Sequence, residues 1–302
     1  MKQPITISIC IPTYRRPDLL NKCLNTIINK LETNNFSVEI VVVDNDKNQM
    51  ARNIVSKYQK NKYKNILYLT SPDRNISLAR NCAVSHSSGN YIAFIDDDEY
   101  PEKNWLIELY NTISRYNSDG VLGPVLPKYA GNPPLWLVKS RLCFRESFPT
   151  GTLLEDPKYM RTGNVLFTHN ILTGSPGPFD PKLGRSGGED KLLFSQLLKA
   201  GCRFVWCNEA NVYEEVPLDR QTKKYYINRA FIRGANAAKY DKLLSFSTIK
   251  SITAIFIYLL IIPFLFVRGQ YLVMKYFEKS CNHISKILAM LGIKIIQEHN
   301  EL

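Results

Sequence analysis

The stretch YIAFIDDDEYP, residues 91–101, joins an apolar run to four consecutive acidic residues. The run itself predicts a buried strand. Carboxylates crowded at the end of such a strand repel one another in a partly desolvated site unless a cation neutralises them. Because alternate residues of an extended segment face the same way, Asp96 and Asp98 can bind one ion while Asp97 points elsewhere. Oxygen ligands of this kind favour Mg²⁺ or Mn²⁺. The alternative is a solvated acidic turn that caps the following helix.

Strand and helix patterns alternate around this stretch. Apolar runs predict strands over residues 5–12, 39–46, 65–69 and 91–98. Apolar residues at helical spacing predict helices over residues 17–28, 48–58, 77–87 and 101–116. This alternation indicates an α/β fold with an open, Rossmann-like, mostly parallel sheet flanked by helices. Such sheets bind ligands at the carboxyl ends of their strands. The predicted strand ends carry Asp44, Asp46, Asp96 and Asp98.

The second half of the chain has a different texture. Residues 128–188 are rich in Gly and Pro, with one clear strand over residues 162–168, and a helix over 188–201 and a strand over 202–207 follow. The helix begins in SGGEDKLL, where two glycines permit close backbone approach and Asp190 could face a bound ligand. The alternative is that Asp190 only stabilises the N-terminus of the helix.

Composition limits the partners and the compartment. The 302 residues carry a formal net charge of +12, which suits nucleic acid, an anionic membrane surface or a phosphorylated ligand. Aromatic residues are not interleaved with the basic ones as stacking on nucleic acid would require, so nucleic acid is not an expected partner. The seven cysteines form no CxxC pair and suggest neither a disulfide framework nor a zinc site. The short apolar N-terminal run stops at Pro12 and does not resemble a signal peptide, so a cytoplasmic location is expected.

Five motifs in a fixed order carry a family resemblance. PTYRRP, VVVDND, SLARN, FIDDDEYP and GGEDKLLFSQLLKAG together resemble the family-2 glycosyltransferases over roughly residues 5–235. The resemblance implies the nucleotide-sugar-binding GT-A fold and an inverting, metal-dependent transfer of a sugar from a nucleoside diphosphate, with UDP as the expected nucleotide. Neither GxGxxG nor GxxxxGK[ST] is present as an alternative phosphate loop.

The resemblance also implies a role for each matching residue. Donor binding falls to the loop after the first strand, the acids after the second, the arginine of SLARN and the first acids of DDD: Pro12, Thr13, Tyr14, Arg15, Asp44, Asp46, Arg80, Asp96 and Asp97. Asp98 and Asp96 match the family's DxD motif and would hold Mn²⁺ or Mg²⁺. Asp190 matches the general base that removes a proton from the acceptor hydroxyl, and Glu189 beside it would shape the acceptor site.

The segment 211–234 resembles a subset of these enzymes that act in bacterial cell-surface polysaccharide synthesis. Glu214 fits their E-x-V-P pattern, and Arg220, Arg229 and Arg233 could close over a diphosphate of the donor or of a lipid-linked acceptor. The alternative is a solvated basic helix. The histidine that helps relatives to hold the metal is missing after the ED pair. Glu214 and Glu215 are the candidates to replace it, and the third protein ligand is left open.

The C-terminal region predicts membrane association. Residues 251–267 are uncharged and barely long enough to cross a bilayer at about 1.5 Å per residue. Residues 270–294 mix apolar residues and lysines like a helix lying in the interface. Six cations flank these segments and suit the anionic cytoplasmic leaflet: Lys239, Lys242, Lys250, Arg268, Lys275 and Lys279. We therefore predict a catalytic domain over residues 1–240 and membrane-associated helices over 241–302. The alternative is a helical subdomain, and crossing, re-entry and lying flat are all left open.

The predicted function is the transfer of one sugar per encounter to a glycan or lipid-linked acceptor. Transfer of one sugar at a time is predicted because QTKKY, residues 221–225, matches the Q-x-x-R-W motif of processive relatives only imperfectly. A nucleotidyltransferase and a non-catalytic, basic membrane-surface protein are the alternatives. Neither the sugar nor the acceptor is identified. Residues that could select the sugar lie in the loop-rich region: Trp136, Arg141, Arg145 and His169.

Overall fold

The chain divides into two compact units. The computed structural model describes residues 6–33, 36–61, 65–172, 174, 177–238, 241 and 245–293, so Lys239 and Lys242 lie outside the described residues. The first unit comprises Met1–Pro127 and Arg145–Glu214, and the second comprises Lys128–Phe144 and Glu215–Leu302. This division assigns residues 215–238 to the same unit as the C-terminal helices, whereas the sequence places a boundary after residue 240. That boundary stays a prediction.

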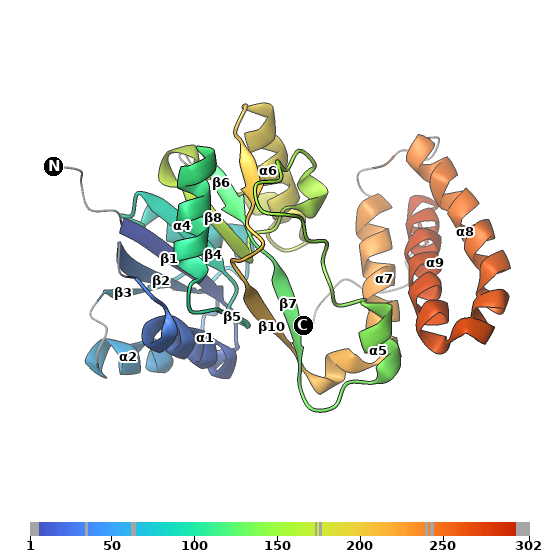
Figure 1. The fold of residues 1–302 in the computed structure, drawn as a ribbon, viewed down its shortest axis with the longest axis horizontal. Coiled ribbons are helices and arrows are strands. Elements are labelled where there is room, and N and C mark those ends of the chain that lie inside the picture. Colours follow the sequence, from blue (N-terminus) through green and yellow to red (C-terminus); the bar gives the residue numbers. More distant parts are fainter. Residues whose placement is uncertain are drawn as a thin grey trace. The chain divides into compact units, whose positions relative to one another are not determined.

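A seven-stranded sheet forms the centre of the first unit, in the order β3-β2-β1-β4-β8-β6-β9 (Figure 1). Its strands are β1 (Thr6–Thr13), β2 (Ser37–Asp44), β3 (Ile66–Thr70), β4 (Tyr91–Ile95), β6 (Gly120–Leu122), β8 (Asn164–Thr168) and β9 (Phe204–Trp206). The first four strands pair in parallel, and β6 pairs in parallel with β9. Strand β8 runs antiparallel to both β4 and β6. The predicted, mostly parallel α/β sheet is therefore confirmed.

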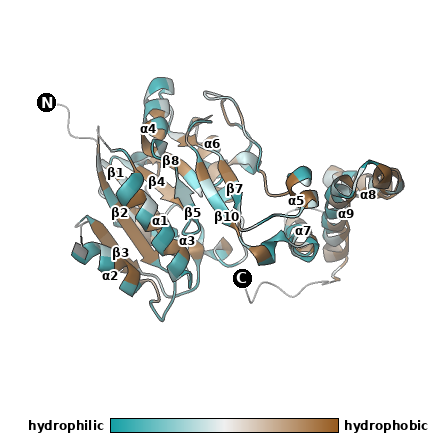
Figure 2. Ribbon diagram, turned by 60° about the horizontal axis from the view of Figure 1, so that its bottom comes forward, coloured by the Kyte–Doolittle hydropathy of each residue, from teal (hydrophilic) through white to brown (hydrophobic). Residues whose placement is uncertain are grey.

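Both faces of this sheet are apolar, and helices cover each of them. On one face, Ile9 and Ile11 of β1 pack in one cluster with Leu24 of α1 and Trp105 of α4. On the other face, Val43 of β2 packs with residues of α3 and α6, such as Ala83 and Phe194. Strands β2 and β3 are drawn largely in the hydrophobic colour in Figure 2, and β2 is buried along most of its length, as expected for a parallel strand covered on both sides. The helices of this unit are α1 (Pro17–Lys30), α2 (Arg52–Asn61), α3 (Ile76–Ser85), α4 (Trp105–Tyr116) and α6 (Glu189–Lys199).

The start of α4 differs from the prediction. The sequence places it at Pro101, but Pro101 ends a short strand, β5 (Glu99–Pro101), and the helix begins at Trp105. Strand β5 pairs antiparallel with β10 (Val212–Val216), which is also ordered beside β7 (Val125–Tyr129) in a small second sheet. Proline tolerates a strand end because it donates no backbone hydrogen bond. The acids of DDDE therefore lie between two strands instead of capping a helix.

The second unit is helical. It contains α5 (Leu135–Ser140), α7 (Lys223–Ala238), α8 (Phe246–Leu265) and α9 (Gln270–Met290), and α9 packs against each of the other three. Gly234 allows α7 to approach α9 closely, because a Cβ at this position would lie 2.1 Å from the carbonyl oxygen of Asn282. The described residues of the two units also form 3₁₀ turns at Pro157–Tyr159, His169–Leu172, Pro181–Leu183, Leu218–Gln221 and Phe266–Arg268.

Candidate active site

The predicted acids lie where the sheet changes direction. From β1 the chain proceeds outward to β2 and β3, and then returns to add β4 on the other side of β1. The carboxyl ends of β1 and β4 consequently lie next to each other, at the position where open α/β sheets bind ligands. The Oγ1 of Thr13, the last residue of β1, donates a 2.7 Å hydrogen bond to Oδ2 of Asp97 after β4. This bond joins the two strand ends.

Asp97 and Asp98 share one arginine. Nη1 of Arg16 lies 3.4 Å from Oδ1 of Asp97 and 3.0 Å from Oδ2 of Asp98. Burial raises the pKa of Asp97 to about 7, although the positive charge of Arg16 opposes this shift. A buried carboxyl that keeps its proton near neutral pH relieves the repulsion expected within DDD.

Asp96 faces away from Asp97 and lies beside Glu99. The backbone N–H of Asp96 donates to Oε2 of Glu99 at 3.1 Å. Burial raises the pKa of both Asp96 and Glu99. Gly163 packs directly against these two carboxylates: a Cβ at residue 163 would lie only 2.7 Å from Oε1 of Glu99 and 3.1 Å from Oδ2 of Asp96. Only glycine allows the backbone to lie this close to the two carboxylates.

Arg80 of α3 connects the donor-side acids to the predicted base. Its Nη1 donates to Oε1 of Glu189 at 2.7 Å and to Oδ1 of Asp190 at 2.9 Å, and its Nη2 lies 3.5 Å from Oδ1 of Asp96. The guanidinium is buried. Burial would lower the pKa of Arg80, but the charges of Asp190, Asp96 and Glu189 outweigh this and raise it. Arg80, predicted to approach a diphosphate, here binds three carboxylates.

The two glycines before Asp190 do not show the close backbone approach that the sequence suggests: a Cβ added at Gly187 would have nothing within 4 Å. Gly187 and Gly188 have φ of 80° and 97°, the left-handed region that favours glycine, and α6 begins directly after them. Asp190 accepts hydrogen bonds from the backbone N–H and Oγ1 of Thr162, at 3.3 and 2.8 Å. Together with Arg80, Thr162 holds the carboxylate while its side chain stays 17 % exposed. Burial, followed by the charge of Asp190, raises the pKa of Glu189.

The acids after β2 differ in their surroundings. Asp44 is fully buried and accepts from the backbone N–H of Asp46, from the backbone N–H of Ala51 and from the hydroxyl of Tyr68, at 2.8 to 3.0 Å. It therefore shapes the turn into α2. Asp46 pairs with Nε of Arg15 at 3.2 Å, and its buried Oδ2 has no hydrogen-bond partner among the described residues. Oδ2 of Asp46 is therefore a buried oxygen that can accept a hydrogen bond from a ligand.

Aromatic and cationic side chains gather beside Asp46. The guanidinium carbons of Arg15 and Arg74 lie 5.1 and 5.4 Å from the ring centre of Tyr14, as cation–π contacts do. Arg15 and Arg74 have φ of 54° and 47°, which is unusual for residues with a side chain. Pro12, in contrast, is buried within β1, where it is paired with Val43 of β2.

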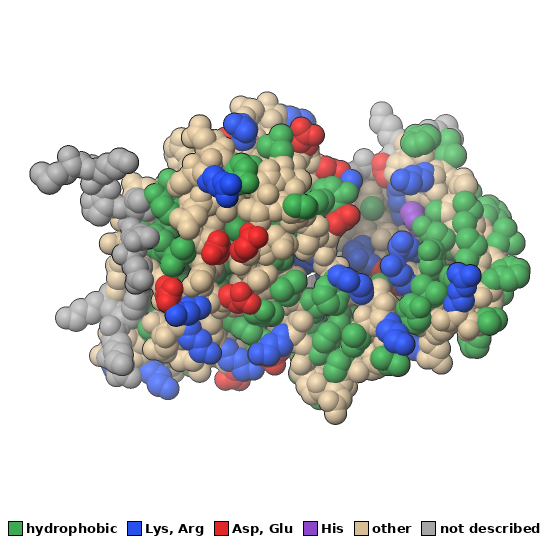
Figure 3. Space-filling model, in the orientation of Figure 1, with side chains coloured by type: hydrophobic (Ala, Val, Ile, Leu, Met, Phe, Trp, Pro, Cys, Tyr) green, Lys and Arg blue, Asp and Glu red, His purple; other side chains and the backbone are tan. Residues whose placement is uncertain are grey.

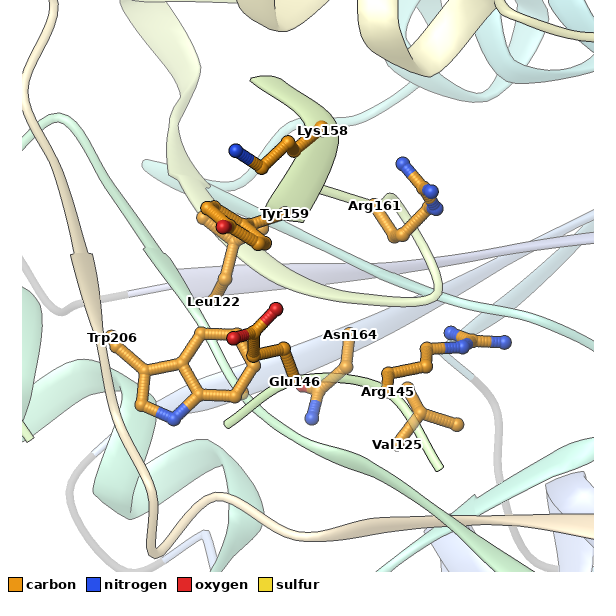
Figure 4. A pocket seen from close by; sticks show the side chains of 10 residues that line it. Leu122, Val125, Arg145, Glu146, Lys158, Tyr159, Arg161, Asn164 and Trp206 are labelled. Carbon is orange, nitrogen blue, oxygen red and sulfur yellow. The ribbon is translucent and has the colours of Figure 1, made fainter. Parts of the chain in front are cut away.

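The first unit contains a pocket of about 250 Å³ (Figure 4). Its walls are formed mainly by polar and aromatic side chains: Arg145, Glu146, Lys158, Tyr159, Arg161 and Trp206. The segment from Arg161 to Asn164 links it to the carboxylates, because Thr162 contacts Asp190 and Gly163 adjoins Asp96. Arg145 lines the pocket and also pairs with Oε2 of Glu214 at 2.9 Å. Two lining residues, Arg161 and Asn164, therefore flank in sequence the residues that contact Asp190 and Asp96.

Other sequence candidates lie elsewhere. Nδ1 of His169 lies 2.7 Å from the carbonyl oxygen of Gly89, which precedes β4 and so marks the edge opposite the acids. Trp136, Arg141, Arg220, Arg229 and Arg233 belong to the second unit. Arg229 and Arg233 share α7 at the predicted spacing, and Arg233 forms an ion pair with Glu278 of α9. Their proposed contact with a diphosphate stays a prediction.

The acidic side chains of the site suit a cation that takes most of its ligands from water and substrate. Within the described residues, no group of three His, Cys, Asp or Glu side chains could hold a metal ion by itself. The side chains of Asp96 and Asp98 are 37 % and 11 % exposed, so Asp96 in particular faces solvent. Mg²⁺ usually takes one or two carboxylates and completes its shell with water and substrate phosphates. Asp96 and Asp98 would supply two carboxylates of that kind, with no third protein ligand grouped with them among the described residues.

Several residues of this site escape sequence reasoning. Arg16 and Glu99 stand inside the quoted motifs PTYRRP and DDDEYP, so neighbourhood alone could have marked them. Thr162 and Gly163 read only as the start of a strand, and Lys158, Arg161 and Trp206 carry no motif at all. Their role depends on contacts between distant segments.

Comparisons with known proteins agree with this geometry. The family model described as "Glycosyl transferase family 2" matches residues 8–177. The succinoglycan biosynthesis protein ExoM of Rhizobium meliloti (strain 1021) is 33 % identical over 233 residues, which cover 76 % of this chain and 72 % of that protein. The glycosyltransferase GlyA of Streptococcus pneumoniae serotype 4 is 32 % identical over 117 residues, 39 % of this chain but only 16 % of that protein. The structure of S. aureus TarS 1-349 in complex with UDP-GlcNAc shares the fold, with a TM-score of 0.58, 16 % identity and coverage of 98 % and 97 % of the two chains.

Proposed function

The chain belongs to glycosyl transferase family 2, and from this premise we propose that it moves one sugar per encounter from a nucleoside diphosphate sugar to a glycan or lipid-linked acceptor. One observation carries the proposal. A donor-side acid, Asp96, and an acceptor-side acid, Asp190, face the same buried guanidinium at the switch point of the sheet. In such a transfer, the acceptor oxygen attacks the anomeric carbon from the side opposite the leaving diphosphate. Asp190 would serve the attacking oxygen, and Asp96 would serve the diphosphate.

UDP is the proposed nucleotide, and cell-surface polysaccharide synthesis is the proposed setting. The support is the UDP-GlcNAc complex of the TarS structure, which shares this fold, and the name of ExoM, which refers to succinoglycan biosynthesis. In this chain, Asp46 would accept a hydrogen bond from the base or the ribose through its unpartnered Oδ2, with Tyr14 and Arg15 beside it. Asp44 would act indirectly, by holding the turn after β2.

Asp96 and Asp98 are the proposed ligands of a divalent cation, Mn²⁺ or Mg²⁺. When bound, such a cation stabilises the negative charge that develops on the leaving diphosphate. The two carboxylates fit this task because they lie at the strand end, one of them solvent-facing, and leave room for phosphate oxygens.

Asp190 is the proposed general base. Its carboxylate would take the proton of an acceptor hydroxyl while that oxygen bonds to the anomeric carbon and the bond from this carbon to the diphosphate breaks. Attack from the side opposite the leaving group inverts the anomeric centre. Thr162 and Arg80 would keep Asp190 oriented, and Glu189 would border the acceptor. The pocket lined by Tyr159 and Trp206 is the proposed place for the acceptor, because its lining residue Arg161 directly precedes Thr162, which holds Asp190.

Contact with an anionic membrane surface, on the cytoplasmic face, is also proposed. Among the described residues, one helix is long and apolar enough to cross a bilayer, Phe246–Arg268, and only 6 % of its most apolar stretch is buried.

Arg220, Arg229 and Arg233 would bind a diphosphate on the donor or on a lipid-linked acceptor.

Calorimetric titration of nucleoside diphosphate sugars tests the proposal. We expect one of them to bind in the presence of Mn²⁺ and not in chelator, with loss of binding in Asp98→Ala and no loss in Glu155→Ala, an exposed acid outside the site. Turnover should release the nucleoside diphosphate. Release of pyrophosphate would indicate a nucleotidyltransferase instead, and a folded protein that binds no sugar nucleotide would refute the proposal.

A further inference from the structure

Helix α8 has one packed side and one apolar, solvent-facing side. Thr248 and Ser251 are buried, and the packed side continues through Tyr258. The solvent-facing side is almost entirely apolar, with nine large hydrophobic residues: Phe246, Ile249, Ile252, Phe256, Ile257, Leu259, Leu260, Ile261 and Phe264. Figure 3 shows apolar side chains gathered over this helix, with Lys and Arg side chains beside them. The helix contains no acidic residue and one lysine, Lys250.

Helix α9 runs back along the packed side of α8 (Figure 1). At the N-terminal end of α8, Oγ1 of Thr248 lies 3.7 Å from Sδ of Met290, near the C-terminal end of α9. At the middle of α8, the ring of Tyr258 lies 5.4 Å from that of Tyr276 and 6.0 Å from that of His283. The two helices therefore form an antiparallel hairpin that is in contact over most of its length.

This hairpin brings polar groups to the middle of α8. Lys279 and His283 lie on α9 within a turn or two of the Tyr258 contact, and Glu278 is buried in the same helix. Burial, followed by the charges of Lys286, Lys250 and Lys279, lowers the pKa of His283. Lys286 is itself held by Oγ of Ser247 and the carboxylate of Asp241, at 2.7 and 2.5 Å.

If α8 crossed a bilayer along its normal, its midpoint at Tyr258 would lie at the centre of the hydrocarbon. Helix α9 would then carry Lys279, Glu278 and His283 to that depth, where ionisable groups are strongly disfavoured. If α8 lies parallel to the surface, its apolar side enters the boundary between headgroups and acyl chains while α9 stays on the water side. The exposed cations beside the patch, Lys250 and Arg268, would then meet anionic headgroups.

We infer that α8 binds an anionic lipid bilayer as an in-plane helix and does not cross it, because the α8–α9 hairpin packs His283 against the midpoint of α8 and places Lys279, one turn away on α9, at the same level. This inference rests on the membrane contact proposed above, but not on glycosyl transfer. It assigns the apolar side of α8 to lipid and keeps the turn between α8 and α9 on the same side of the membrane as the first unit.

Vesicle flotation of the full chain tests the membrane contact. We expect binding to vesicles of phosphatidylcholine and phosphatidylglycerol that exceeds binding to phosphatidylcholine alone. Phe256→Asp and Leu260→Asp should each weaken binding roughly 10-fold or more. Leu67→Asp is the matched control, because Leu67 is an exposed leucine of edge strand β3, and it should change nothing. Equal binding by the α8 variants and the wild type would remove lipid as the occupant of this side.

Labelling with a membrane-impermeant maleimide tests the orientation. Gln270→Cys places a thiol at the exposed turn between the helices, and Lys199→Cys places one on the exposed end of α6 in the first unit. In intact spheroplasts and in inverted vesicles, we expect both thiols to react from the same side, above the background of the wild-type cysteines. Reaction of the two thiols from opposite sides would show that α8 crosses the membrane and would overturn the inference, even if vesicle binding were normal.

Discussion

Replacing Arg80 by methionine should destabilise the first unit and leave a deficit that grows with pH. Methionine keeps much of the volume of the side chain but removes the charge that three carboxylates share, those of Glu189, Asp190 and Asp96. Removing one partner of a buried ion pair costs about 3–5 kcal/mol, because the remaining charge is left uncompensated. Asp96 and Asp190 are both partly exposed, and Asp96 and Glu189 can take up protons, so we expect a loss of about 2–4 kcal/mol at neutral pH.

The pH dependence follows from the two acids with raised pKa. Burial already raises the pKa of Asp96 and Glu189, and loss of Arg80 would raise both further. A carboxyl whose pKa is higher in the folded than in the unfolded state favours folding at low pH, and this contribution is lost as pH rises through the folded pKa. The deficit of Arg80→Met should therefore be larger at about pH 8 than at about pH 5.5.

Differential scanning fluorimetry at the two pH values measures this. A loss of 2–4 kcal/mol corresponds to a melting temperature lower by roughly 5–10 °C for a domain of this size. The melting temperature of Arg80→Lys should lie between those of the wild type and Arg80→Met, because lysine keeps the charge but not the forked geometry. Arg185→Met, at an exposed arginine that binds only the backbone of Asp73 in the described contacts, is the control and should change little. An Arg80→Met variant that melts with the wild type but loses UDP affinity would show that Arg80 binds the diphosphate, as the family resemblance implies, and does not hold the acids.

Three further changes test other parts of the site. Asp190→Asn should lower the rate of sugar transfer by roughly 10²–10⁴-fold, measured by release of nucleoside diphosphate, while calorimetric donor affinity stays normal; unchanged transfer would remove Asp190 as the base. Gly163→Ala should destabilise the fold by roughly 1–3 kcal/mol in thermal unfolding, because its Cβ would lie 2.7 Å from Oε1 of Glu99, and a stable variant would contradict this close packing. Asp97→Asn should remove a loss of stability that the wild type suffers as pH rises toward about 7, because the carboxyl ionises there at the expense of the fold; parallel pH profiles of melting temperature would count against a raised pKa.

Periodicity predicts the sheet because each of its strands is a local apolar run. The segments 5–12, 39–46, 65–69 and 91–98 each overlap a strand of the observed sheet. Local patterns cannot predict direction, and so the antiparallel insertion of β8 between β4 and β6 was not expected from residues 162–168. The error at Pro101 has a similar origin. A proline before an amphipathic segment usually opens a helix, but here the pairing of Glu99 with Glu214 of β10 extends the chain first.

The acids of DDD show what a motif can and cannot specify. Their crowding correctly marks the strand end, but the alternation of side chains is not observed, because residues 97 and 98 form a turn in which the N–H of Glu99 donates to the carbonyl oxygen of Asp96. Asp97 and Asp98 therefore share Arg16, while Asp96 lies by Arg80. What balances the charges was not foreseeable. The chain itself supplies cations, Arg16 to Asp97 and Asp98 and Arg80 to Asp96, so the unliganded acids do not require a metal ion to be close together.

The meeting of Arg80 with Asp190 depends on sheet order and not on any sequence pattern. The two residues are 110 positions apart, and α3 and α6 pack on the same face of the sheet, so each helix brings its residue to the carboxyl edge. Asp190 alone could be a helix-stabilising acid, and Arg80 alone could be a phosphate ligand. Their 2.9 Å contact instead links the base to the strand-end acids through one buried cation. A substitution on either side must therefore change the charge felt on the other, which is why the pH dependence of Arg80 variants is more informative than loss of activity.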